Sequence, residues 1–145
     1  MWIPLTAQTL LSRVTASEAS ALARAAVASG QTDALAEIAA LVAAEWRGGL
    51  RRVTVVDSRD GYVPDEILPH VLADLRYRAF TRLPGMSGLL DDLRVKEWER
   101  ANHVRDNLVK VSVAAPDAAY AEAAGSSGKP GPAIADPDEN SVLGW

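Results

Sequence analysis

The chain contains no cysteine in its 145 residues. A disulfide framework, a thiolate metal site and a thiol nucleophile are therefore excluded. Aromatic residues are also scarce, at 6%, although apolar residues as a whole reach 48%. A core with so few aromatics must be built mainly from Ala, Leu and Val, which favours closely packed helices over a β-sandwich. The composition predicts an all-α domain.

Long hydrophobic runs are missing as well. No apolar run approaches the ~20 residues that span a bilayer, so we expect no membrane segment. The first residues, MWIPLTAQTLLSR, have no basic side chain ahead of the apolar ones, and Pro4 interrupts the apolar stretch. This pattern argues against a signal peptide, and we expect synthesis in the cytoplasm.

Residues that could carry chemistry are few. The two histidines, His70 and His103, both lack a second imidazole at the i+3 or i+4 spacing of a helical metal site. The segment DSRDG, residues 57–61, has the composition of a calcium loop, but Arg59 and Leu68 occupy its third and twelfth positions, where ligands are needed. No phosphate-binding glycine loop, Gly-x-Ser-x-Gly elbow or His-Glu-x-x-His motif occurs. We expect neither an enzyme nor a protein that holds a metal or cofactor.

The net charge of −4 is unevenly distributed. Residues 1–115 hold 14 Lys and Arg against 14 Asp and Glu, whereas residues 116–145 hold one lysine against five acids. We interpret residues 1–115 as a neutral helical domain and residues 116–145 as an acidic C-terminal tail. A neutral body argues against general DNA binding, which requires a positive face.

Capping signals delimit the first helices. Thr6 is a suitable N-cap for a short helix. Thr15 and Glu18 have capping-box spacing and start a second, Ala-rich helix that runs to Ser29, with Gly30 as a left-handed C-cap. We expect four or five helices in all, packed as a small bundle with an extended tail.

The third helix is predicted to begin near Thr32 or Asp33 and to be the central element of the bundle. Its apolar residues keep helical spacing over about five turns. They are Leu35, Ile38, Ala39, Val42, Trp46, Leu50 and Val53. Residues 54–64 break this pattern, and any β structure is expected within residues 53–63.

Two further helices follow. We expect Pro64 to open the fourth helix, Pro69 to lie in its first turn, and a Pro-Gly pair after Leu83 to end it. The fifth helix is predicted from residue 87 or 88 to about residue 111. Its inward-facing residues are expected to be Leu90, Leu93, Trp98, Ala101, Val104, Leu108 and Val111.

The tail differs in composition from Pro116 onward. AAYAEAA, residues 118–124, favours one or two turns of helix, and GSSGKPGPAIADPDEN is typical of a linker. We expect residues 116–145 to be disordered in the free monomer and to dock in an assembly; a passive solubilising tail is the alternative. The tail residues expected to contact a partner are Asp136, Asp138, Glu139, Val142, Leu143 and Trp145.

Arginines cluster on two of the predicted helices and beside the loop between them. Asp74 and Arg78 can pair at i,i+4 spacing, but not every arginine has an opposite charge at such a position. Arginine is favoured in protein interfaces. We therefore expect the following residues to face another protein: Arg47, Arg51, Arg52, Arg76, Arg78 and Arg82.

A helix-turn-helix regulator is the competing interpretation, with residues 16–29 and the helix from Asp33 joined by a short turn. Its recognition helix would begin with Asp33 and Glu37, and its first turns contain no Arg, Lys, Asn or Gln to contact base edges. This DNA-binding alternative is weakly supported.

Several pieces of the chain together resemble one family of phage proteins. They are WIPLT, AALVAAEWRGGL, VPDEILPHVLADLRYRAFTRLPG and LRVKEWERANHVRDNLVKVSVA, which extend over roughly residues 2–113. The most telling parts are Glu45-Trp46-Arg47-Gly48, Val63-Pro64-Asp65-Glu66 and Arg76-Tyr77-Arg78 with Leu83-Pro84. In these parts the chain is similar to the small head-to-tail adaptor, or connector, proteins of tailed bacteriophages, and to the Mu-type group in particular. The acidic tail has no counterpart in this resemblance.

The resemblance implies a structural virion protein without enzymatic activity. Such adaptors form a ring, expected here to be a dodecamer of neighbouring subunits, that sits under the portal protein after DNA packaging and joins it to a stopper or tail protein. Packaged DNA would be only the content of the channel. A stopper or head-completion protein of the same connector is the alternative within this class.

Overall fold

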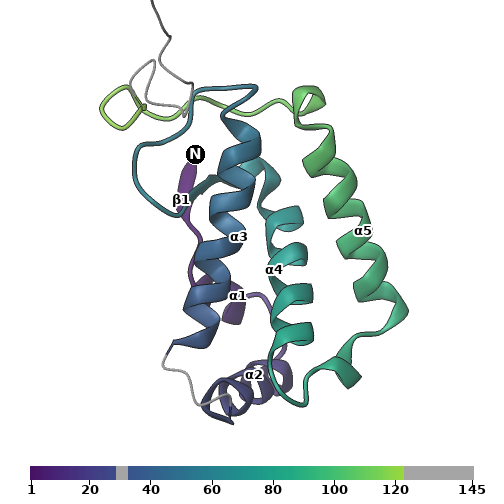
Figure 1. Ribbon diagram of the computed structural model, residues 1–145. Helices are drawn as coiled ribbons and strands as arrows, with labels where there is room; N and C mark the ends of the chain where they lie inside the picture. The colour runs from purple at the N-terminus through teal and green to yellow at the C-terminus, as the bar shows by residue number, and fades with distance from the viewer. Residues whose placement is uncertain (29–32, 123–145) are drawn as a thin grey trace, which may run out of the picture.

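A computed structural model describes residues 1–28 and 33–122 of the chain. In this part, three long helices lie side by side: α3 (Ala34–Leu50), α4 (Leu68–Arg82) and α5 (Asp92–Asp106), with α4 between the other two (Figure 1). α1 (Ala7–Leu11) packs against α3 and α4, and α2 (Ala16–Ala28) lies below α3 and α4 in Figure 1. The mostly helical fold predicted from composition is confirmed.

α3 is the central element of the core, as its apolar spacing predicts. It begins after its N-cap Asp33, and Val42, Trp46 and Leu50 on its inner face are completely buried. Burying a large apolar side chain stabilises the fold by roughly 1.5–3 kcal/mol, so this stripe contributes strongly to stability. Val53 was included in the predicted stripe, but it follows the end of the helix and is 42% exposed.

The predicted N-caps of the first two helices are confirmed. Thr6 Oγ1 accepts a hydrogen bond from the Thr9 amide at 3.2 Å. Thr15 Oγ1 accepts from the Glu18 amide at 3.2 Å, and the Glu18 carboxylate accepts from the Thr15 amide at 3.3 Å, which completes the capping box. The predicted end of α2 at residues 29–30 lies outside the described residues.

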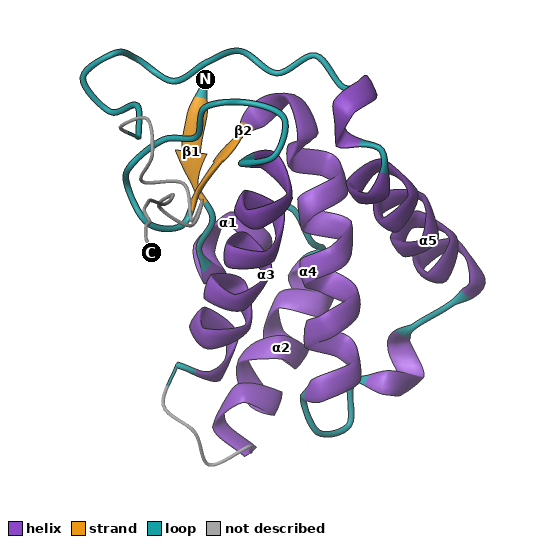
Figure 2. Cartoon of the chain, turned by 45° about the horizontal axis from the view of Figure 1, so that its top comes forward, coloured by secondary structure: helices purple, strands orange, loops and turns teal. Residues whose placement is uncertain are grey.

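β structure is confirmed at the end of the predicted range, residues 53–63, but it also occurs at the start of the chain, where none was predicted. β1 (Trp2–Pro4) pairs antiparallel with β2 (Tyr62–Pro64), and Trp2 lies opposite Pro64 (Figure 2). A three-residue strand is too short for an alternating pattern, and its partner is far away in the sequence, so β1 was missed. Because the sheet has two strands, both lie at an edge, where proline is tolerated.

The start of the fourth helix also differs from the prediction. Pro64 ends β2, and a 3₁₀ turn, Asp65–Ile67, leads into α4. Pro69 lies in the first turn of α4, as predicted. Proline is favoured there because the amides of a first helical turn have no intrahelical acceptor.

α5 is shorter than predicted at both ends. The side chain of Asp91 caps it and accepts from the Arg94 amide at 2.9 Å. Separate 3₁₀ turns flank the helix at Ser87–Leu89 and Leu108–Lys110, and the apolar spacing runs on through them, which explains the overestimate. Leu93 was expected to face inward, but it is 60% exposed.

Residues 111–122, which we call the strap, return from the end of α5 across the two strands (Figure 2). The Trp2 indole donates to the Ala114 carbonyl at 2.9 Å, and the Glu66 carboxylate accepts from the Ala114 amide at 2.8 Å. Residues 118–120 form a turn in place of the helix expected there. Residues 116–122 lie against the body of the single chain, so the expected disorder does not begin at residue 116. The rest of the tail, with all six predicted contact residues, lies outside the described residues.

Candidate protein interface

Arg47 was predicted to face a partner, but the structure holds it inside the protein. It projects from α3, and the residue is only 3% exposed. Its guanidinium donates to the Tyr62 carbonyl at 2.8 Å and to the Asp57 carbonyl at 2.7 Å. These bonds satisfy one carbonyl of the loop between α3 and β2 and one at the start of β2. Burial lowers the pKa of Arg47 from its usual value. Arg47 therefore links segments of its own chain and is too buried to contact a partner protein.

Arg51 fixes the end of the strap. Its Nε donates to Glu122 Oε1 at 3.1 Å, and its Nη2 donates to Glu122 Oε2 at 2.9 Å. This bidentate pair holds the pKa of the Glu122 carboxyl below its usual value. The Glu122 amide also donates to the Val56 carbonyl at 2.9 Å. The strap is thus bound to the loop by backbone and side-chain contacts together.

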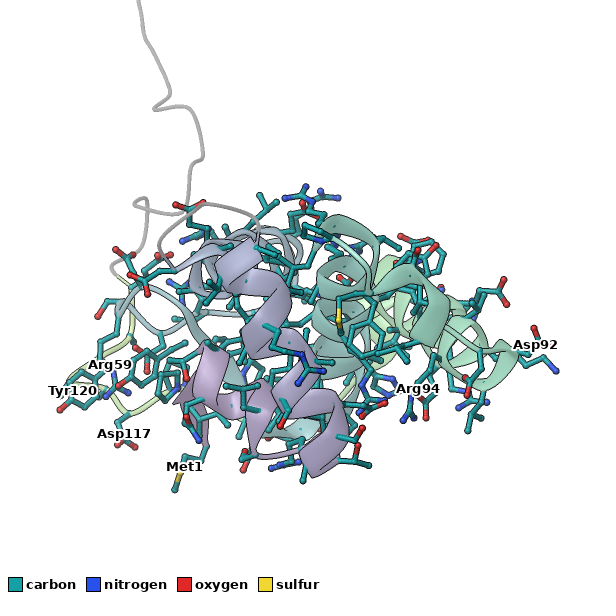
Figure 3. All side chains as sticks on the ribbon, turned by 90° about the horizontal axis from the view of Figure 1, so that it is seen from below. Met1, Arg59, Asp92, Arg94, Asp117 and Tyr120 are labelled. Atoms are coloured by element: carbon teal, nitrogen blue, oxygen red, sulfur yellow. The ribbon has the colours of Figure 1, made fainter. Side chains whose placement is uncertain are left out.

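Asp57 pairs with Arg59 of the same loop and is completely buried. Its carboxylate accepts from Arg59 Nε at 2.9 Å and from Arg59 Nη2 at 2.7 Å, and this pairing lowers the pKa of Asp57. The Arg59 guanidinium lies 3.9 Å from the ring centre of Tyr62 and 3.7 Å from that of Tyr120. Figure 3 shows Arg59 and Tyr120 together on one side of the molecule. Both oxygens of the Asp57 carboxylate therefore accept hydrogen bonds from within the DSRDG segment.

A second cluster gathers around Asp74, which is completely buried on α4. Its carboxylate accepts from the indoles of Trp46 at 2.9 Å and Trp98 at 3.2 Å. It also accepts from Arg78 Nε at 3.0 Å, the predicted i,i+4 pair, and from Arg105 Nη1 at 3.1 Å. One carboxylate therefore joins α3, α4 and α5. We call these five residues the Asp74 cluster.

Arg78 of this cluster also forms an ion pair with Glu45 of α3. Its two terminal nitrogens donate to the Glu45 carboxylate at 2.8 and 2.7 Å and lower the pKa of Glu45. The residue before Arg78 is Tyr77, whose ring stacks on the Trp98 ring with centroids 3.9 Å apart. The pieces that carry the phage resemblance, Glu45-Trp46 and Arg76-Tyr77-Arg78, thus act in this chain as contacts between helices.

Arg76 is also held by its own chain. Its Nη1 lies 3.5 Å from Glu97 of α5, and its Nε is buried without a hydrogen-bond partner among the described residues. Arg94 shares this carboxylate at 3.7 Å and pairs with Glu18 of α2 at 3.1 Å. Arg94 lies on the side of the molecule opposite Arg59 and Tyr120 (Figure 3).

Arg52 and Arg82 remain as exposed members of the predicted interface set. Neither makes a side-chain ion pair or hydrogen bond within residues 1–28 and 33–122. α3 and α4 run in opposite directions, as the contacts Trp46–Asp74 and Glu45–Arg78 require, so the two arginines lie at opposite ends of this helix pair. They cannot form one continuous patch.

A groove at the Arg52 end has the character of a protein contact surface. We call it the end groove; its volume is about 490 Å³, and it is lined by Ala44, Glu45, Gly48, Gly49, Arg52, Val53, Arg105, Asp106, Leu108 and Val109. Val109 is 77% exposed, Val53 is 42% exposed and the nearby Val55 is 49% exposed. Exposed valines beside arginine are typical of surfaces that another protein covers.

Two glycines of α3 line this groove for different reasons. A Cβ on Gly49 would lie 3.0 Å from Leu108 Cδ1, so the close packing of Leu108 accounts for that glycine. A Cβ on Gly48 would meet nothing within 4 Å. Glycine in a helix costs about 0.5–1 kcal/mol relative to alanine, so packing within the chain does not explain Gly48.

Sequence reasoning missed most of these contacts. The Asp74–Arg78 and Arg94–Glu97 pairs have a signal in the local spacing, because their partners lie four and three residues apart. The partners Arg51 and Glu122 come from distant segments, and Trp46 meets Asp74 only after the helices pack. Arg51, which lacks an acid at helical spacing, is therefore paired through the tertiary fold.

Within the described residues, no group of three or more His, Asp and Glu side chains is placed to hold a metal ion. No described helix has the length and hydropathy needed to cross a membrane.

No family model, curated protein or solved structure matches this chain.

Proposed function

We propose that this protein is a structural virion subunit, the head-to-tail adaptor of a tailed phage or prophage. The proposal rests on the resemblance of residues 2–113 to Mu-type adaptors, which covers roughly the same residues as the described body. A helical body with a neutral charge and an acidic tail suits a subunit that packs against copies of itself. Its partners would be neighbouring subunits, the portal protein and a stopper or tail protein.

The observation that carries the proposal is the end groove. A subunit of a ring must offer a surface to a neighbour. Here Val53 and Val109 expose apolar area, and the Arg52 guanidinium has no partner among the described residues. Gly48 adds to this argument, because an open glycine lets a partner approach the helix backbone closely. We propose that the end groove is a subunit contact and that head-to-tail packing through it closes a ring.

The experiment is to image the purified full chain with and without the portal protein of the same genome. We expect rings with the portal, and we expect Val109→Asp to abolish them while the helical circular dichroism stays unchanged. Val27→Asp is the matched control, because Val27 is 82% exposed on α2 and lies outside the end groove. Rings that form equally well with Val109→Asp would remove the groove from the contact. The absence of any complex with the portal would overturn the adaptor assignment.

The competing DNA-binding regulator is disfavoured by the position of its recognition helix. That helix would be α3, whose first residues Ala34 and Leu35 are buried together with Ile38. A recognition helix must leave its N-terminal residues free to enter the major groove. A stopper or head-completion protein remains the alternative within the same machine, and binding to an assembled adaptor rather than to the portal would identify it.

A further inference from the structure

One hollow of the described structure carries an excess of positive charge. We call it the basic hollow; it lies between α4 and α5, has a volume of about 300 Å³ and is lined by Arg13, His70, Arg76 and Arg100 with Glu97 as its acid. The end groove, by comparison, sets Arg52 and Arg105 against Glu45 and Asp106. The basic hollow therefore differs from it in net charge, although both are open to solvent.

The excess charge belongs to two particular arginines. Arg76 and its neighbour Arg94 are balanced by Glu18 and Glu97, which pair with them. Arg13 and Arg100 are exposed, and neither makes a side-chain ion pair within the described residues. An uncompensated pair of guanidinium groups beside a hollow favours a carboxylate ligand.

The local chemistry supports an anionic occupant. Burial, and then the charge of Arg94, lower the pKa of Arg76 from its usual value. Burial, and then the charge of Arg100, lower the pKa of His70. A neighbouring arginine contributes in both cases, and a bound carboxylate would offset that repulsion.

We propose that the basic hollow binds the acidic segment Asp136–Asp138–Glu139 of the same chain. This segment holds three of the five acids of residues 116–145, and Glu122, one of the others, is already paired with Arg51. The match is one of charge: three carboxylates meet a hollow that carries two uncompensated arginines. The contact differs from tail docking on a portal or neighbour, and it does not depend on the proposed function.

The length of chain beyond the strap permits this contact. Asp136 lies 14 positions after Glu122, and an extended chain spans at most about 3.3–3.6 Å per residue, or roughly 46–50 Å. A domain of this size has a radius of gyration of about 14 Å, which corresponds to a sphere roughly 36 Å across, so the extended segment is longer than the domain is wide. Tethering also gives a local concentration in the millimolar range, which populates a contact too weak to form between separate molecules.

The test uses the absence of cysteine. Ser141→Cys in the full chain gives a single thiol for a nitroxide label, and paramagnetic broadening of backbone amide signals then reports where the tail lies. We expect broadening at Ala73 and Arg100 beside the hollow at low salt, and its loss near 1 M salt, where the Debye length is about 3 Å.

Charge variants test whether electrostatic attraction holds the acidic segment at the basic hollow. Arg100→Glu should remove the broadening, and Asp136→Lys with Asp138→Lys in the same chain should restore it. Arg52→Glu, an equally exposed change outside the hollow, should leave it intact. The proposal fails if no broadening occurs at the hollow, or if it survives Arg100→Glu. It also fails if broadening appears only in a mixture of labelled and isotope-enriched chains, because the tail would then reach a second copy.

Discussion

Single residues decide how the helices of this protein are joined, and Asp74 is the main example. Its carboxylate lies in the core without exposure and accepts from two indoles and two guanidinium groups. A buried carboxylate is stable only when it is paired and fully hydrogen-bonded. Removing it leaves the donors around it without an acceptor. The sequence indicated only the Arg78 contact, because the other donors come from α3 and α5.

We predict that Asp74→Ala destabilises the protein by about 3–5 kcal/mol, the usual cost of removing one partner of a buried ion pair. Urea denaturation followed by circular dichroism measures this change. Asp106→Ala, the same substitution at an exposed position of α5, is the control and should change stability by less than about 0.5 kcal/mol. Equal effects of the two substitutions would show that the Asp74 cluster does not hold the helices together.

Acid should weaken three ion pairs: one between α3 and α4, one in the loop after α3 and one that holds the strap. Arg78, Arg59 and Arg51 hold the pKa values of Glu45, Asp57 and Glu122 below their usual values. The unfolded chain therefore takes up protons first as the pH falls, so stability is full above the unfolded pKa values of about 4 and decreases below them. We expect the free energy of unfolding to fall from about pH 5 downward.

Glu122→Gln tests this dependence at one carboxyl. We expect a loss of about 1–2 kcal/mol at pH 7, typical of a charge-assisted hydrogen bond, and a smaller decrease in stability between pH 5 and pH 3. The difference from the unaltered chain should shrink as the pH falls. Glu99→Gln removes an exposed carboxylate on α5 and serves as the matched control. A variant that keeps the full pH slope would contradict the role of the Arg51–Glu122 pair.

At the scale of secondary-structure elements, the length of each helix or strand decided whether the sequence could predict it. α3 has 17 residues and an uninterrupted apolar stripe, so its position, its buried face up to Leu50 and its start near Thr32 or Asp33 were predicted correctly. β1 and β2 have three residues each and are defined by pairing across the fold rather than by a local pattern. The ends of α5 were misplaced because apolar spacing does not separate an α-helix from the 3₁₀ turns beside it.

Gly48 gives a prediction at this scale. Gly48→Ala should stabilise the free protein by about 0.5–1 kcal/mol, because the new methyl meets open space and alanine favours the helix. Thermal unfolding measures the gain. Gly49→Ala should gain less or lose stability, since Leu108 would have to shift. If Gly48 is kept for close approach of a neighbour, Gly48→Ala should also weaken ring assembly; a variant that is both more stable and equally able to assemble would contradict that role.

For the whole molecule, the described body contains a continuous hydrophobic core and the strap that closes over it. We therefore expect the body to fold without the last part of the tail. Sequence analysis separated body from tail by composition, and it placed the change near residue 116 because the contacts of Glu122 have no local signal. Interface residues were the hardest to predict, since most arginines proved to be paired within the chain.

Deletion of residues 137–145 tests the tail at this scale. We expect the helical circular dichroism and the thermal midpoint to be unchanged, and attachment to the portal or to a neighbouring subunit to weaken. Replacing Val142, Leu143 and Trp145 with serine in a chain of full length separates the apolar contacts from the loss of the segment. A shortened chain that assembles and joins heads to tails as well as the complete one would show that the tail is only a solubilising extension.

The bond between Trp2 and Ala114 also fixes an order of events during synthesis. The Trp2 indole leaves the ribosome before its acceptor, which follows 112 residues later. At a rate of about 5–20 residues per second, the indole waits roughly 6–22 s for that partner. Helices α3, α4 and α5 lie between these two residues in the chain, and β1 can pair with β2 as soon as Pro64 has emerged. The strap is then the last described part to close, so the Trp2 indole stays without its acceptor until nearly all of the described body has been made.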